Sequence, residues 1–241
     1  MSVRLIVRTL SEICITIGAV IVLFVAYVLF WTGVTAEGAT DGEIVRLQEE
    51  WARQPVATSP GPKQTGPGAP PAPPPDPAPR TAKPYASGRP FAVMYVPRFG
   101  TGWAWPVLEG TGAATLRKGL GHYAGSARLG ATGNFSVAGH RRTHGDPFKD
   151  FPRLRPGDAV VLNDGTTWFT YRIRNKPYRT VPGDVGVVAP VPVKSGFDGP
   201  GRYLTLTTCD PEWGSSHRLV VWAHLDATQP VTRGEPEAFH S

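Results

Sequence analysis

The sequence predicts an all-β domain, a barrel or a sandwich, preceded by a single apolar helix and a proline-rich segment. Short β-branched and aromatic runs separated by Gly and Pro recur from about Phe91 to about Ala227, which is typical of short strands joined by turns. Helical periodicity is scarce there, apart from helical turns expected near 112–119 and 147–153. The predicted segments are a cytoplasmic N-terminus (1–12), a transmembrane anchor (13–31), a juxtamembrane segment (32–54), a disordered proline-rich linker (55–90), the folded domain (91–227) and a C-terminal tail (228–241).

The apolar run at 13–31 is long enough to cross a bilayer. It contains no charged residue, and as a helix it spans roughly 28 Å, close to the thickness of the hydrocarbon core. Arg4 and Arg8 precede it and acidic residues follow it, so the positive-inside rule places the N-terminus in the cytoplasm and the rest outside. A cleaved signal peptide remains the alternative, because "TAEGA" at 35–39 resembles a weak cleavage site.

The next two segments lead away from the membrane. Ile44, Leu47 and Trp51 recur at helical spacing and predict a short juxtamembrane helix. Half of the 26 prolines fall within 55–90. Such a stretch cannot bury a core and favours extended polyproline II at about 3.1 Å per residue, so we expect a spacer. A docking motif for proline-binding modules is the alternative.

The predicted strands of the folded domain are "FAVMYVPRF", "WAWPVLEG", "NFSVAGH", "DAVVLND", "TWFTYRIRNKPYRTV", "YLTLTTC" and "RLVVWAHL". The chain has a formal net charge of +6. An outward-facing basic domain suits contact with anionic envelope polymers or lipid headgroups, although the charge also serves simply to keep the surface solvated. Nucleic acid is not an expected partner, because basic and aromatic residues do not interleave.

Cys209 is an unpaired thiol in a domain expected outside the cytoplasm. The chain has two cysteines, and Cys14 lies in the predicted membrane span, so the two cannot pair within one chain. Oxidising compartments favour paired structural cysteines. Strand alternation puts Cys209 on the face of Thr205 and Thr207, opposite Leu206. Cys209 is therefore either an accessible nucleophile or a small buried apolar residue.

A nucleophilic thiol needs a cation or a base, because a free thiol is mostly protonated at neutral pH. In a hairpin, the last residue of one strand lies beside the first residue of the next, which brings Arg218 opposite Cys209. Arg218 could equally be a solvated cation at a strand end. His140, at the end of "NFSVAGH", is the candidate base. It precedes the cysteine in the chain, the reverse of papain-like enzymes.

Zinc is not expected, although His140 and His144 have the spacing that a helical metal site would use. Gly145 and Pro147 interrupt a helix at that point, and no third ligand is evident. We therefore expect neither a metal nor another cofactor.

The motifs around these residues resemble those of sortases. The resemblance rests on "TLTTC" at 205–209, Arg218 after it and "AGHRRTHGDPF" at 138–148 before it. With "GLGHYAGSA" at 119–127 and "LRPGD" at 154–158, the region 91–226 is similar to class E sortases of high-GC Gram-positive bacteria. The resemblance implies a closed eight-stranded β-barrel with short helices, and a transpeptidase anchored in the cell membrane.

The same resemblance implies a substrate and residue roles. Cys209 would cleave an LAxTG-like sorting signal of secreted proteins between Thr and Gly, and a peptidoglycan-precursor amine would then take the acyl group. His140 would transfer protons, and Arg218, with the backbone N–H after the cysteine, would stabilise the oxyanion. Thr208 would line the site. Tyr123 would contact the sorting peptide, or pack as an ordinary barrel tyrosine.

Two positions depart from the class E pattern. His144 stands where a tyrosine is expected, and Asp210 directly follows the cysteine. An acid turned inward would disfavour a thiolate, so we expect Asp210 to start the Asp-Pro turn and face solvent. Three alternatives stay open: a pilin-polymerising sortase that uses a pilin lysine, a hydrolase that releases proteins, and a non-catalytic extracellular β-barrel scaffold.

Overall fold

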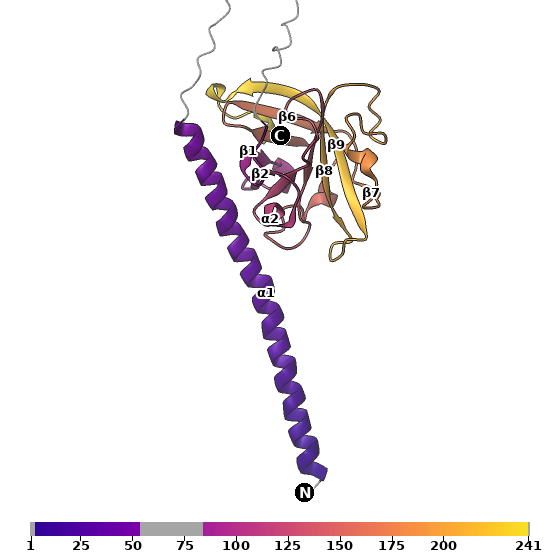
Figure 1. The fold of residues 1–241 in the computed structure, drawn as a ribbon. Coiled ribbons are helices and arrows are strands. Elements are labelled where there is room, and N and C mark those ends of the chain that lie inside the picture. The colour runs from indigo at the N-terminus through magenta and orange to yellow at the C-terminus, as the bar shows by residue number, and fades with distance from the viewer. Residues whose placement is uncertain (1–2, 54–83, 241) are drawn as a thin grey trace, which may run out of the picture.

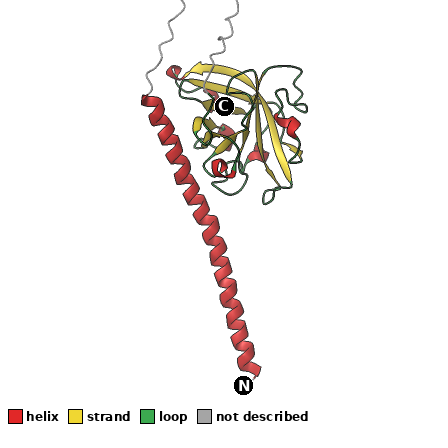
Figure 2. Cartoon of the chain, in the orientation of Figure 1, coloured by secondary structure: helices red, strands yellow, loops and turns green. Residues whose placement is uncertain are grey.

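A computed structural model describes residues 3–53 and 84–240 of the chain. These residues form one long helix beside a body of short strands (Figures 1 and 2). Most of the predicted proline-rich linker, 55–90, lies outside the described residues. The strands are β1 (Pro90–Tyr95), β2 (Ala104–Glu109), β3 (Leu120–His122), β4 (Gly133–Ala138), β5 (Ala159–Asn163), β6 (Thr167–Ile173), β7 (Tyr178–Thr180), β8 (Arg202–Asp210) and β9 (His217–Pro230).

The strands close into an eight-stranded barrel, as the sequence predicts. The hydrogen-bonded order is β6-β5-β1-β2-β3-β4-β8-β9, and β9 pairs back onto β6 to complete the circle. The short strand β7 lies outside the circle and adds to β9. The pairs β2–β3 and β4–β8 are parallel, and the other ladders are antiparallel.

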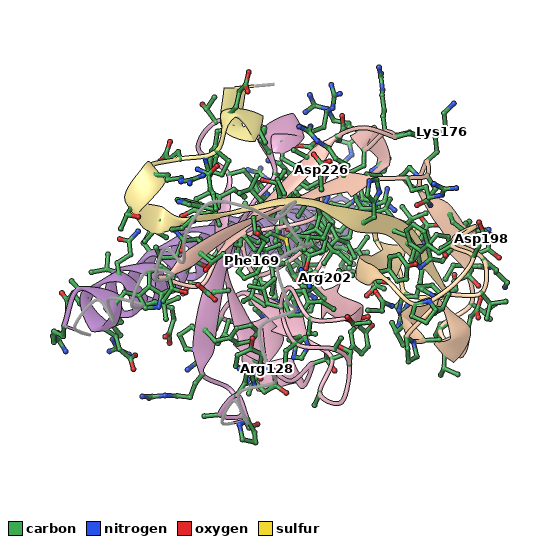
Figure 3. The ribbon with its side chains drawn as sticks, turned by 90° about the horizontal axis from the view of Figure 1, so that it is seen from above. Arg128, Phe169, Lys176, Asp198, Arg202 and Asp226 are labelled. Carbon is green, nitrogen blue, oxygen red and sulfur yellow. The ribbon has the colours of Figure 1, made fainter. Side chains whose placement is uncertain are left out.

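Side chains from all around the barrel fill its interior. Phe135 on β4, Leu206 on β8 and Val221 on β9 belong to one buried cluster, and alternation along each strand sends their neighbours to the opposite face. Figure 3 shows the side chains crowded within the barrel, while the labelled Lys176 and Asp198 point outward at its edge.

Short helices occupy turns of the chain. Of the two helical regions that the sequence predicts, 112–119 contains α2 (Ala113–Leu116) and 147–153 contains η2 (Phe151–Arg153). The other short helices are η1 (Pro97–Phe99), η3 (Val185–Val188), η4 (Val231–Arg233) and η5 (Glu237–His240).

The N-terminal helix differs from the sequence prediction. Instead of an anchor at 13–31 followed by a separate juxtamembrane helix, one helix, α1 (Val3–Arg53), runs through both segments. Its stretch Ile6–Tyr27 has a mean hydropathy of 2.3 and is long and apolar enough to cross a membrane, by length and composition. The end of α1 packs beside the barrel, where Leu47 is 3% exposed and Glu43 lies 3.4 Å from Lys118.

The packed region extends beyond the predicted limits of 91 and 227 at both ends. Tyr85, placed by sequence in the linker, stacks on Phe91 with ring centroids 3.7 Å apart. At the other end, Phe239 of the predicted tail packs against Tyr95 and Trp168, with centroids at 5.0 and 5.4 Å. These aromatic contacts cover the barrel, so residues 84–90 and 228–239 belong to its structure.

Candidate active site

The hairpin of β8 and β9 places Cys209 next to Arg218. The two residues are direct partners in the antiparallel register, where side chains on one face lie about 4.5–5.5 Å apart at Cβ. Arg218 Nη1 donates to the backbone carbonyls of Ser215 and His217, each at 2.9 Å. Both Cys209 and Arg218 are partly exposed. A cation therefore lies beside a thiol that solvent reaches.

The parallel pairing of β4 with β8 brings His140 to the same place. Ala138 is the register partner of Thr207, and the Gly139 N–H donates to the Thr207 carbonyl at 3.1 Å. Continuing that register puts His140 beside Cys209. Cys209 and Arg218 thus lie on the adjacent strands β8 and β9, and His140 lies two residues beyond the end of β4, the other neighbour of β8.

His140 is half-buried and stacks on His144, with ring centroids 4.8 Å apart. Burial lowers the pKa of His140 below its ordinary value, the charge of His144 lowers it further, and Asp146 opposes both. The pKa of His144 is also lowered, by burial and then by Arg117. The neutral imidazole of His140 is therefore favoured at neutral pH.

A small cavity of about 80 Å³ lies beside Arg218. Tyr123 and Thr207 line it, and the Tyr123 hydroxyl lies 3.0 Å from the Thr207 hydroxyl. The remaining lining residues come from the end of β7 and the segment after it: Thr180, Val181, Pro182, Asp184, Val185, Val187 and Val188. The cavity is adjacent to the guanidinium and half of its lining residues are apolar, and its volume suits a single side chain.

Thr207, and not Thr208, faces this cavity. Thr208 is 3% exposed and lies on the face of Leu206, toward the barrel interior. Its hydroxyl donates to the Gly139 carbonyl at 2.8 Å, so it ties the segment that carries His140 to β8. Alternation from Cys209 is the sequence signal that identifies Thr207, since the two share a face.

Asp210 does not face solvent, contrary to the sequence expectation. Its side chain is 15% exposed and accepts hydrogen bonds from Arg141 at 2.5 Å and Arg179 at 2.7 Å. Burial would raise the pKa of Asp210, but the hydrogen bonds from Arg179 and Arg141 outweigh it and leave the pKa below its ordinary value. Arg179 and Arg141 are 31 and 69 positions away from Asp210 in the chain, so no local sequence pattern predicts these contacts.

Within the described residues, no group of three or more His, Cys, Asp and Glu side chains is placed to hold a metal ion. What the site brings together is a thiol, an imidazole and a guanidinium. A thiol can attack an acyl carbon, an imidazole can carry the proton, and fixed N–H donors can stabilise the oxyanion. The arrangement suits acyl transfer.

Comparisons with known proteins agree with this chemistry. The family described as "Sortase domain" matches residues 94–226. A curated relative, "Sortase SrtE1" of Streptomyces coelicolor, is 36% identical over 97% of this chain, and the chain spans 61% of that relative's length. The structure of sortase E from Streptomyces avermitilis is 69% identical, with a TM-score of 0.62, over 64% of this chain and 99% of that one. The crystal structure of Sortase E1 from Streptomyces coelicolor "with tripeptide in the active site" is 39% identical, with a TM-score of 0.60, over 64% and 99% of the two chains.

Proposed function

Because this chain belongs to the sortase family of cysteine transpeptidases, we propose that it cleaves an LAxTG-like sorting signal between Thr and Gly. The acyl group of the Thr is then passed to an amine of the peptidoglycan precursor. The observation that carries this proposal is the register pairing of Cys209 with Arg218, with His140 just beyond the end of the neighbouring strand β4. Relatives named as class E sortases, one of them solved with a tripeptide in its active site, support the substrate class.

The first half-reaction forms a thioester. His140 takes the proton of the Cys209 thiol and becomes the imidazolium. The resulting thiolate attacks the Thr carbonyl carbon, and the carbonyl electron pair moves to oxygen, where Arg218 donates hydrogen bonds. When the oxyanion collapses, the carbon–nitrogen bond breaks and the leaving glycine amine takes a proton from the His140 imidazolium. Because the oxyanion is stabilised by guanidinium N–H donors, this stabilisation does not depend on the protonation state of His140.

The second half-reaction uses the thioester to form a new amide. The acceptor amine attacks the thioester carbon, neutral His140 takes a proton from its nitrogen, and the carbon–sulfur bond breaks to restore the thiolate. Because the acyl group is held as a reactive thioester between the two steps, the amine can form the new amide without a further energy source. The cavity of about 80 Å³ beside Arg218, half of whose lining residues are valine or proline, receives one side chain of the sorting peptide.

The location follows from α1. We propose that Ile6–Tyr27 spans the cell membrane and that Arg4 and Arg8 keep the N-terminus in the cytoplasm. The barrel then lies outside, where secreted proteins with sorting signals and lipid-linked precursors meet. A pilin lysine remains the alternative acceptor, which would make the protein a pilin-polymerising sortase.

The test offers both acceptors to the full chain in nanodiscs. An LAxTG-type peptide is incubated with equal amounts of a stem-peptide mimic and a pilin-lysine peptide, and the products are identified by mass spectrometry. We expect the amide to the stem peptide, and none from Cys209→Ala. A product formed mainly with the pilin lysine would support the alternative acceptor. Uncleaved peptide, with folded protein, would contradict the transpeptidase assignment.

A further inference from the structure

A charged network joins the chain neighbours of all three proposed active-site residues. Its central member is Asp210, which carries two salt bridges with distances of 2.5 and 2.7 Å. The neighbours concerned are Asp210 after Cys209, Arg141 after His140, and His217 before Arg218. We propose, on the basis of the proposed function, that Asp210 is a positioning residue that fixes how Cys209, His140 and Arg218 lie relative to one another.

Two arms extend from the Asp210 carboxylate. Oδ1 accepts from Arg141 Nη1 at 2.5 Å, which links β8 to the segment of His140. Oδ2 accepts from Arg179 Nε at 2.7 Å on β7, and Arg179 Nη2 lies 3.0 Å from His217 Nδ1. The Asp210 carboxylate, which follows Cys209 in the chain, therefore connects the segment of His140 with the segment of Arg218.

The network lies on the other side of the strands from the cavity. Cys209, Arg218 and Thr180 are register partners across β8, β9 and β7, and the last two line the cavity. Alternation therefore turns Asp210 and Arg179 away from it. Asp210 would act through its neighbours, without touching the substrate.

The segment after His140 needs such support because its backbone is unusual. Thr143, His144 and Asp146 all have positive φ, at 75°, 51° and 53°, a region that residues other than Gly adopt at a cost. Arg141 holds the start of this segment to Asp210, and its side chain is only 10% exposed. Next to it, Arg142 donates to Glu212 in the β8–β9 turn and to Asp146.

If Asp210 acted directly through its charge, removing that charge would speed turnover, whereas loss of a positioning residue slows it. A carboxylate near a sulfur disfavours the thiolate, so removing the charge would make Cys209 more reactive. A positioning role predicts slower turnover with a thiol that is at least as reactive. Measuring thiol alkylation and peptide turnover on one variant therefore separates the two roles.

The experiment compares Asp210→Asn with Asp158→Asn in the full chain. Asp158 is a matched control, because it also pairs with an arginine, Arg98, at 2.5 Å and its side chain is 8% exposed. It precedes β5, which contributes no site residue. For each variant we measure kcat and KM for the LAxTG-type peptide, the iodoacetamide alkylation rate of Cys209 at pH 7, and the thermal unfolding midpoint.

We expect Asp210→Asn to lower kcat on the order of 10- to 100-fold, with KM within about threefold and alkylation unchanged or faster. Asp210→Glu should recover part of kcat, and Asp158→Asn should keep it. Turnover of Asp210→Asn within about twofold of wild type would overturn the proposal. So would a loss of kcat matched by the control variant, which would show a general loss of structure.

Arg179→Gln keeps the test decisive if Asp210→Asn does not fold, because the Arg179 side chain is 55% exposed. We expect it to lower kcat several-fold with KM unchanged, and unaltered kcat would overturn the proposal. If both variants fold, their effects should be less than additive when combined, since they act through one contact. A wild-type chain with no turnover would defeat the proposed function itself, whereas active wild type with equally active variants defeats only the positioning role.

Discussion

Arg218 is anchored in a way that leaves part of its guanidinium for a substrate. The hydrogen bonds found among the described residues use Nη1, which donates at 2.9 Å to the carbonyl of Ser215 in the β8–β9 turn and to that of His217, the first residue of β9. Nε and Nη2 are left to donate to a carbonyl oxygen at the neighbouring Cys209. The backbone carbonyls fix the plane of the group in advance, which is the condition for effective oxyanion stabilisation.

Replacing Arg218 tests this assignment. We expect Arg218→Ala to lose on the order of 10²–10³-fold in kcat, as when one oxyanion donor is removed. Arg218→Lys should recover the activity only in part, because an ammonium cannot bind the two carbonyls through one nitrogen while further N–H groups in a fixed plane face the substrate. Steady-state kinetics with the sorting peptide measures both. Near wild-type kcat in Arg218→Ala would show that the oxyanion is stabilised elsewhere.

Replacing His144 should shift the pH dependence of kcat/KM, because His144 affects the pKa of His140. Burial and then the charge of His144 lower the pKa of His140, so its imidazolium form is lost at lower pH than in a free histidine. His144→Asn removes the second cause, the pKa rises, and the imidazolium persists to higher pH. The ratio of kcat/KM at pH 8 to that at pH 6 should therefore rise.

An NMR titration of the His140 ring measures the same shift directly. His224→Asn is the control, because His224 is exposed on β9, outside the site. It should leave the pH profile and the His140 titration unchanged. A lower ratio, or a lower His140 pKa, in His144→Asn would contradict this account.

At the scale of elements, the hairpin is what sequence predicts best. Adjacent strands joined by a short turn have a register that alternation and the turn determine, so the sequence alone pairs Cys209 with Arg218. The placement of His140 beside them depends on the parallel pairing of β4 with β8, a long-range contact. The sequence identified His140 as the candidate base and the resemblance to a known family supported it, but no local pattern predicted the pairing of β4 with β8. Thr208 was predicted to line the site, whereas its neighbour Thr207 lines the cavity, because one position along a strand is the opposite face.

Substituting Gly139 tests how tightly the chain just after β4 packs against its neighbours. A Cβ there would lie 2.6 Å from Phe148 and 2.7 Å from Leu120 side-chain atoms, so Gly139→Ala forces the end of β4 and His140 to shift. We expect a loss of about 1–3 kcal/mol in unfolding free energy, together with slower turnover. Gly112→Ala, with nothing within 4 Å of the new Cβ, is the control for denaturation and kinetics. Equal stability of the two variants would contradict the packing described for Gly139.

For the whole molecule, the closure of the barrel and the packing of residues 84–90 and 228–239 against it could not be predicted from any short segment of the sequence. The pairing of β6 with β9 joins residues fifty or more positions apart. Tyr85 and Phe239 cover the barrel from segments whose composition suggests a linker and a tail. Asp210 was misjudged for the same reason, since Arg141 and Arg179 are distant in the chain. The apolar helix and the strand-rich domain are local features, so sequence predicted them.

The packing of α1 on the barrel predicts a specific crosslink. Carbodiimide joins carboxylates to amines in contact, so Glu43 and Lys118, 3.4 Å apart, should yield a crosslinked peptide in the full chain in nanodiscs. Lys118→Arg keeps the charge but should remove the product. Leu47→Asp should also remove it, because an exposed ion pair alone contributes little and the apolar contact holds the helix. Asp184 and Lys194, 2.8 Å apart, provide an internal positive control, and a crosslink at this pair alone would contradict the docking of α1.

The central claim is that Cys209, His140 and Arg218 form one acyl-transfer site. The most direct test is mass spectrometry of the intact chain after incubation with an LAxTG-type peptide and no acceptor amine. The account predicts a mass increase equal to the peptide up to its Thr, located on Cys209 by digestion, abolished in Cys209→Ala and strongly reduced in His140→Ala. An adduct on another residue, or an unmodified Cys209 in folded chain while the peptide is cleaved, would contradict it.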